Sequence, residues 1–269
     1  MARAKAGTAL AAPKSSIPAN WKQKLLAKAK AQHESISVSA GNKMSITKKG
    51  TFAYQGGDLG SEIEVVILSM GALKVFYDTP YTKDDPGTPA CFAVKLDDRN
   101  IAPHRDSPNV QAEVCADCPH NEWGSSNRKG SRGKACADKV RLGLISVDDI
   151  KTVSDVSQLE IAMLELPVTS GGTFKKYAKR VTGATELPLW CLVTKLIADE
   201  DAEWEAIKAP ELVGEVPAAL LDGLERLSAQ AEELILTPYD SSGYKGGGKG
   251  AKAARASKKS TQKKRSRMS

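Results

Sequence analysis

Four of the five cysteines lie in one part of the chain, in the order Cys91, Cys115, Cys118 and Cys136. Cys115 and Cys118 form a Cys-x-x-Cys pair followed at once by Pro119, and two sulfurs at this spacing can bind one ion from a single tight turn. One cysteine on each side of the pair completes the four thiolates of a closed tetrahedral site. The sequence therefore predicts a structural zinc centre with these four cysteines as ligands.

Other uses of these cysteines stay open at the level of sequence. His104 and His120 lie in the same stretch, and histidine can replace cysteine at zinc. A Cys-x-x-Cys pair can also be a redox centre, although such a pair normally opens a helix after a strand. Four thiolates suit an iron–sulfur cluster as well. Cys191 stands apart in the apolar run 189–193, which predicts a buried structural side chain.

The charge of the chain is strongly partitioned. Its 269 residues carry a formal net charge of +7. Residues 1–33 hold seven Lys and Arg, residues 245–269 hold ten, and neither segment contains Asp or Glu. The other 22 basic residues stand against all 32 acidic ones, so the middle of the chain is net acidic. Basic segments of this composition bury too little apolar surface to fold alone, and they attract polyanions, above all nucleic acid.

Hydrophobic periodicity predicts a mainly β, α+β fold. Strands are expected at 36–39, 44–46, 51–54, 62–70, 73–77, 158–168 and 187–197, with 62–70 and 73–77 as a pair around Gly71, and a helix or strand at 140–145. Helices are expected at 21–32, 173–181 and 216–236, the last with Leu220, Leu221, Leu224, Leu227, Ala231 and Leu234 as its buried stripe. So many short strands with few helices favour a small β-barrel with additions.

Changes in composition divide the chain into three parts. Residues 1–34 are predicted to be a basic arm with a short helix, residues 35–238 a folded core, and residues 239–269 a disordered basic tail. No apolar run is long enough to span a membrane, and the chain begins without the apolar segment of a signal peptide. We therefore expect no membrane association.

Cations and aromatic rings supply the chemistry of single-stranded nucleic-acid binding, which needs phosphate contacts and faces on which bases stack. Most aromatic side chains are expected in the core, whereas Trp123 stands among polar residues and is expected to be exposed or to cover the zinc site. The predicted nucleic-acid contacts are Lys48, Lys49, Tyr54, Trp123, Arg128, Lys129, Arg132, Lys134, Lys175, Lys176, Lys179 and Arg180.

The sequence contains few residues in patterns typical of catalytic sites. The chain has three histidines and no nucleophile elbow. Pairs of Asp at 84/85, 97/98 and 148/149 could bind magnesium, but they lie in turn-like contexts where Asp serves the backbone. We expect no enzymatic activity and no small-molecule substrate.

The cysteine-rich stretch resembles a family of proteins from tailed bacteriophages. The order of parts is also similar to the zinc-containing single-stranded-DNA-binding proteins of T-even phages, where a zinc ribbon is inserted among OB-fold strands. The match covers about residues 75–195, and 166–170 with Phe174 and Tyr177 fits less specifically. The residues that carry it are Cys91, Cys115, Cys118, Pro119, Asn121, Trp123, Gly124, Ser125, Gly133, Lys134 and Cys136.

The resemblance implies an OB-like barrel with a zinc ribbon inserted at about 91–136. It further implies non-sequence-specific binding of single-stranded DNA in phage replication or recombination, with other replication or recombination proteins as partners, in the cytoplasm of the infected bacterial host. The T-even metal site uses one His and three Cys, whereas Cys91 here favours four thiolates.

Two features depart from that family pattern. The middle of the chain is acidic, and the C-terminal segment is basic where the family has an acidic partner-binding tail, so the acidic helix at 216–236 is the candidate partner element instead. The alternative function is therefore a zinc-ribbon protein that binds another protein, such as a polymerase subunit, a transcription-associated factor or a virion component. Its basic arms would then serve as nucleic-acid tethers.

Overall fold

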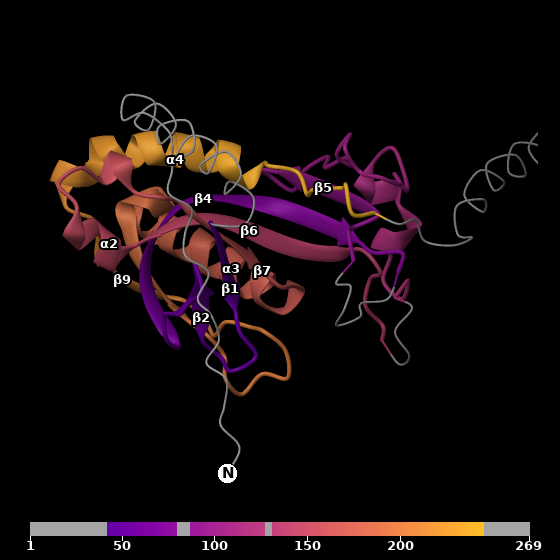
Figure 1. The fold of residues 1–269 in the computed structure, drawn as a ribbon, viewed down its shortest axis with the longest axis horizontal. Coiled ribbons are helices and arrows are strands. Elements are labelled where there is room, and N and C mark those ends of the chain that lie inside the picture. Colours follow the sequence, from indigo (N-terminus) through magenta and orange to yellow (C-terminus); the bar gives the residue numbers. More distant parts are fainter. Residues whose placement is uncertain (1–41, 80–86, 127–130, 245–269) are drawn as a thin grey trace, which may run out of the picture. The chain divides into compact units, whose positions relative to one another are not determined.

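The fold is seen in a computed structural model that describes residues 42–79, 87–126 and 131–244 (Figure 1). The predicted helix at 21–32 and strand at 36–39 lie outside these ranges. The strands are β1 Lys43–Ile46, β2 Phe52–Tyr54, β3 Gly57–Asp58, β4 Glu62–Phe76, β5 Cys91–Lys95, β6 Ala137–Ser146, β7 Ala162–Leu166, β8 Leu192–Ile197 and β9 Glu211–Glu215. The α-helices are α2 Val147–Thr152, α3 Val168–Thr185 and α4 Leu221–Ile235, and short 3-10 turns include η1 Cys115–Asp117, η2 Pro119–Asn121 and η4 Leu189–Cys191.

All nine strands of the described chain belong to one open sheet. Its order is β3-β2-β1-β7-β6-β4-β8-β9, and β5 also pairs with β4. Only the β1–β7 pair is parallel among these pairings. The prediction of an α+β fold is confirmed, but that of an OB-like barrel is wrong because the sheet does not close. Helices cover its faces, so the sheet forms a layer between helices and does not enclose a core of its own.

The long strand β4 is the centre of this sheet. It pairs with β6 along one edge, while its other edge pairs first with β8 and then with β5. The expected turn around Gly71 is wrong, since Gly71 lies inside β4. A side chain there would come within 2.9 Å of the Lys95 carbonyl oxygen, so the glycine serves close packing.

The core lies on both faces of the sheet. On one face Val65 and Ile67 of β4 pack in a cluster with Phe174 of α3. On the other face Val66 packs with Leu227 of α4. Figure 1 shows α4 along one side of the sheet and α3 on the opposite side. The stripe predicted for the last helix is confirmed: Leu224, Leu227 and Ala231 are fully buried and Leu220, Leu221 and Leu234 pack partly against them.

Beyond the paired ends of β4, β5 and β6 the chain forms what we call the cap, residues 97–126 and 131–136. Within these residues the only helical elements are η1 and η2. Backbone bonds join the cap to β5 and close it on itself, from His104 N to Phe92 O at 2.7 Å and from Cys136 N to His120 O at 2.8 Å. None of the helices in the described ranges is long and apolar enough to cross a membrane.

Candidate metal centre and nucleic-acid interface

The four cysteines singled out in the sequence meet around one small cavity. Cys91 begins β5, Cys136 directly precedes β6, and Cys115 and Cys118 lie in and just after η1. All four side chains are buried, and none forms a disulfide. The fold therefore brings together thiols that are up to 45 residues apart in the chain.

The cavity has a volume of about 10 Å³, which suits a single small occupant. No imidazole and no carboxylate lines it. The ring of His120 instead stacks on Phe76 at 4.0 Å, and that of His104 stacks on Phe92 at 5.3 Å. Besides the cysteines, the lining residues are Lys74, Phe76, Phe92, Ala93, Pro103, Gln111, Ala112 and Asn121.

The thiols share a cavity without forming a closed ligand shell. Among the residues that the structure describes, no group of three or more His, Cys, Asp or Glu side chains has the arrangement that holds a metal ion. Zinc–sulfur bonds are about 2.3 Å long, so binding requires all four sulfurs at that distance from one point. Four cysteine sulfurs fit zinc in kind and number. In this structure they are free thiols that are not yet arranged as metal ligands.

Burial controls the ionisation of these thiols. Burial and the neighbouring Cys91 raise the pKa of Cys115 to about 11, against the opposing charge of Lys74. Burial likewise raises the pKa of Cys136 to about 12, and Lys74 again opposes it. The two thiols therefore stay protonated at neutral pH unless a cation enters the cavity.

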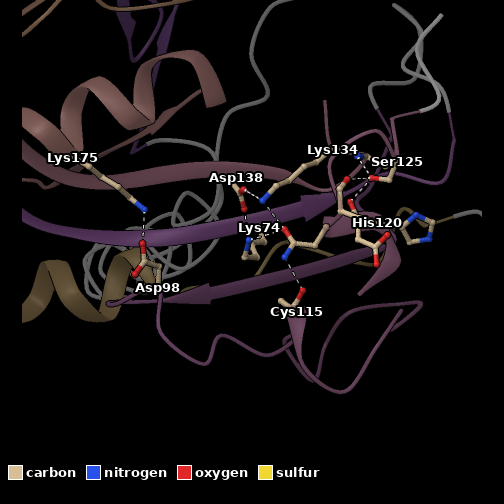
Figure 2. Close-up of polar contacts among 11 residues, drawn as sticks. Lys74, Asp98, Cys115, His120, Ser125, Lys134, Asp138 and Lys175 are labelled. Atoms are coloured by element: carbon tan, nitrogen blue, oxygen red, sulfur yellow. Dashed lines mark hydrogen bonds and ion pairs between the residues drawn. The ribbon is translucent and has the colours of Figure 1, made fainter. Parts of the chain in front are cut away.

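A polar network joins the cysteine pair to the sheet (Figure 2). Asn121 donates from Nδ2 to the Cys115 carbonyl at 2.9 Å, and its Oδ1 accepts from Lys74 and Lys134, each at 3.1 Å. Both lysines also bind Asp138 on β6. Burial opposes the charge of Asp138, but the bonds from Lys134 and Lys74 outweigh it and hold the pKa of that carboxyl below its ordinary value. The network thus places the Lys74 ammonium beside the thiols, with Lys134 bound to the same Asn121 and Asp138.

Trp123 projects from the cap and does not line the cavity. Its side chain is 79% exposed, and Lys134 Nζ lies 5.4 Å from the centre of its ring. The turn beneath it is fixed by Gly124, which has a φ of +86° and donates to the Gly133 carbonyl at 3.0 Å. Ser125 Oγ accepts from the backbone of Ala135 at 3.0 Å. The indole therefore stands in solvent on a well-bonded turn.

A groove of about 360 Å³ lies between α3 and the chain that follows β5. Lys175 and Lys179 of α3 line one side, and Asp98 lies opposite, with its carboxylate 2.9 Å from Lys175 Nζ. That bond holds the pKa of Asp98 below its ordinary value. The apolar lining is Met70, Ala72, Leu96, Ala178 and Leu189.

The groove and the cysteine cavity lie on the same face of the sheet. Met70 and Ala72 of β4 line the groove, and Lys74, the next residue on that face, lines the cavity. Figure 2 shows the Lys175–Asp98 pair and the Lys74–Asp138–Lys134 group along β4. The site therefore extends from the groove to the cap along a single strand.

The other predicted contacts are dispersed. Lys48 and Lys49 are exposed in the turn between β1 and β2, and Tyr54 is half-buried against the core beneath α3. Lys176, Lys179 and Arg180 are exposed on α3, and Arg132 is exposed in the cap. Arg128 and Lys129 lie outside the described residues.

Sequence reasoning missed Lys74, Asn121 and Asp98 as parts of the site. Asn121 stood in the cysteine motif and Asp98 in an Asp pair, but Lys74 carried no local signal.

Comparison with known proteins finds no relative. No protein-family model, no curated protein and no solved structure matches the chain.

Proposed function

We propose that this protein binds single-stranded nucleic acid without sequence preference, on the face that runs from Trp123 to the groove beside α3. The observation that carries the proposal is Trp123, 79% exposed with Lys134 beside its ring. The exposed indole offers a base-stacking face, and Lys134, held beside it by Asn121 and Asp138, adds positive charge next to that face. Stacking of one base contributes about 1–3 kcal/mol and does not depend on which base it is.

The groove continues the path of the strand. Lys175 and Lys179 offer cations for phosphates, and Met70 and Leu96 offer apolar surface for a base. Phosphate contacts and stacking on the faces of bases do not depend on which base is bound. Such contacts therefore suit binding without sequence preference. The sequence resemblance adds the proposal that the strand is DNA in phage replication or recombination, in the cytoplasm of the infected host.

We also propose that zinc occupies the cysteine cavity. The support is the meeting of Cys91, Cys115, Cys118 and Cys136 around a space of about 10 Å³ that no imidazole lines. A bound divalent ion supplies the charge that makes buried thiols ionise. Its role here is structural: the ligands lie on both sides of Trp123 in the chain, so binding holds the turn that presents the indole.

The test compares two exposed tryptophans. Trp123→Ala removes the proposed stacking face, whereas Trp204→Ala removes an indole that is 59% exposed in an acidic segment far from the cap in sequence. Binding to fluorescent oligo-dT is measured by anisotropy. Loss of one stacked base, about 1–3 kcal/mol, raises Kd roughly 5- to 150-fold for Trp123→Ala, and Trp204→Ala leaves Kd unchanged. Equal effects of the two variants would refute the proposed interface.

The alternative function, docking of a partner protein, has one observation in its favour. Leu212 and Val213 are exposed on β9, which ends the sheet. A chain lacking 1–33 and 245–269 separates the two functions. Retained, salt-sensitive binding to oligo-dT supports nucleic-acid binding by the folded body, and complete loss supports a partner-binding body with nucleic-acid tethers.

A further inference from the structure

A lysine side chain forms part of the wall of the cysteine cavity. Among the described residues that line this cavity, Lys74 of β4 is the only lysine, and none is an arginine, an aspartate or a glutamate. Strand β4 is paired on both edges at this point, since Lys74 lies opposite Ala93 of β5 and opposite Asp138 of β6. The sheet therefore fixes the backbone from which the ammonium approaches the thiols.

The register of the strands also places two of the cysteines close to this lysine. Cys91 lies opposite Phe76 in the β4–β5 pair, and Cys136 is the residue before β6 begins. Side chains of a strand alternate between its faces, so Lys74 and Phe76 share one face of β4. Lys74 is thus one step along that face from the level at which Cys91 begins β5.

Hydrogen bonds hold the ammonium in place (Figure 2). Lys74 Nζ donates to Asn121 Oδ1 at 3.1 Å and binds the carboxylate of Asp138. Asn121 in turn donates from Nδ2 to the Cys115 carbonyl at 2.9 Å. The amide of Asn121 therefore joins the lysine to the backbone of the Cys-x-x-Cys turn, so the cation and the thiols are positioned by the same contacts.

A metal with four thiolate ligands needs such a cation. The charge of four ionised sulfurs exceeds that of a divalent ion, so the filled site is a net anion. A buried net charge is costly unless an opposite charge lies close to it. Lys74 supplies an opposite charge on the wall of the cavity, and the carboxylate of Asp138 offsets part of it.

We propose that Lys74 is the counter-charge of the four-thiolate metal centre, an inference that rests on the zinc proposed above. Lys74 is not a ligand: its ammonium stabilises the thiolates once the ion is bound, and Asn121 keeps it beside the turn that carries Cys115. Groups just outside the ligand shell typically change metal affinity about 10- to 100-fold.

The test uses two substitutions that should act in opposite directions. Lys74→Met keeps most of the side chain and removes the positive charge, so Kd for the metal should rise about 10- to 100-fold. Asp138→Asn keeps the shape of the carboxylate and removes the charge that offsets Lys74, so Kd should fall about two- to fivefold. The full chain is titrated with Co²⁺, followed by its sulfur-to-cobalt charge-transfer absorption, and the cobalt is then displaced with Zn²⁺.

Lys134→Met is the matched control. Lys134 binds the same Asn121 and Asp138 and is similarly buried, with a side chain 19% exposed against 14% for Lys74, but it does not line the cavity. Its removal should raise Kd less than Lys74→Met does.

Three results would overturn the inference. Weaker or unchanged metal binding by Asp138→Asn means that the network acts through its structure and not through charge, and this result decides the matter even if Lys74→Met fails to fold. Tighter binding by Lys74→Met means that the ammonium repels the ion. Equal effects of Lys74→Met and Lys134→Met mean that the position on the cavity wall does not matter. A parent protein that gives no cobalt signal refutes the proposed zinc site itself, whereas the other three results leave that site in place.

Discussion

The two ends of β4 are stabilised in different ways. Where α3 and α4 cover the sheet, nineteen buried residues form the cluster on one face and nine form the cluster on the other. Toward the cap the two clusters have four buried residues each, among them three of the cavity cysteines. Burial of apolar surface contributes about 25 cal/mol per Å² and can support the first end, but the two four-residue clusters at the second end bury little area.

The cap lacks the apolar core that stabilises the helix-covered end. A region with so small an apolar core needs another source of stability, such as a bound metal or cross-links. The cap supplies three of the four thiols around the cavity, with Cys91 of β5 as the fourth, and its Asn121 and Lys134 form a network with Lys74 of β4. We therefore expect the helix-covered end to fold by burial and the cap to depend on the metal.

The largest effect should come from Cys118→Ser. Structural zinc contributes about 10–16 kcal/mol in small domains, so losing a ligand should release the metal and open the cap. Mass spectrometry measures the metal content, and hydrogen exchange should show faster exchange at 97–126 with α3 still protected. Cys191→Ser, outside the cavity in η4, is the control and keeps the metal. If the parent protein contains no metal, the cap does not depend on metal for its stability and this prediction is wrong.

Leu227→Ala should produce the next largest effect, at the opposite end. Leu227 of α4 is fully buried against the sheet, so truncation costs about 2–5 kcal/mol of the free energy of unfolding, measured in urea. Metal content should not change. Leu212→Ala, at an exposed position on β9, should cost far less. Equal loss of protection in the cap would show that both ends unfold as one unit.

Glu165→Gln tests the buried ion pair on which the chain after α4, residues 236–244, meets the sheet. Burial opposes the charge of Glu165, but Arg141, Lys43 and Lys139 outweigh it, so the pKa of this carboxyl is below its ordinary value. A lowered pKa adds stability above the ordinary value of about 4.3, and this stability is lost as pH falls through the folded-state value.

The Gln variant keeps the shape of the side chain and loses its charge. It should be about 1–3 kcal/mol less stable at neutral pH, and its urea midpoint should change less than that of the parent as pH falls from 5 to 3. If the variant and the parent have the same pH dependence, the charged carboxyl of Glu165 does not stabilise the fold.

The smallest effect is expected in the groove. The exposed pair Lys175–Asp98 is worth at most about 1 kcal/mol, so Asp98→Asn should hardly change stability. It frees a cation for phosphate, and Kd for oligo-dT should fall about two- to fivefold. Asp201→Asn, which removes an acid paired with Lys208, is the control and should leave Kd unchanged. Weaker binding of oligo-dT by Asp98→Asn would show that the nucleic acid does not bind in the groove.

Local patterns predicted local features well. The Cys-x-x-Cys spacing identified thiols that the fold brings together, the stripe of α4 was read from its period, and the polar neighbours of Trp123 were consistent with its exposure. Each of these depends on residues close together in the chain.

Features with non-local causes were missed. The sequence predicts a turn at Gly71 because the contact that requires a glycine there, the close approach of the Lys95 carbonyl, comes from a residue 24 positions away. Strand β9 was missed because most of its residues are exposed on both faces, which leaves no alternation. Whether a sheet closes into a barrel depends on which strands pair, and strand pairing has no local sequence signal. The groove likewise has none, because it pairs Asp98 with Lys175 of α3, 77 residues away.

The parallel pairing of β1 with β7 has a consequence for synthesis. Lys43 pairs with Met163, so 120 residues separate the partners. At roughly 5–20 residues per second, a ribosome needs about 6–24 seconds to deliver the second strand after the first. During that interval Met44, Ile46 and Phe52, all buried in the finished sheet, lack their final neighbours. The emerging chain should therefore be a good client for chaperones until β7 arrives.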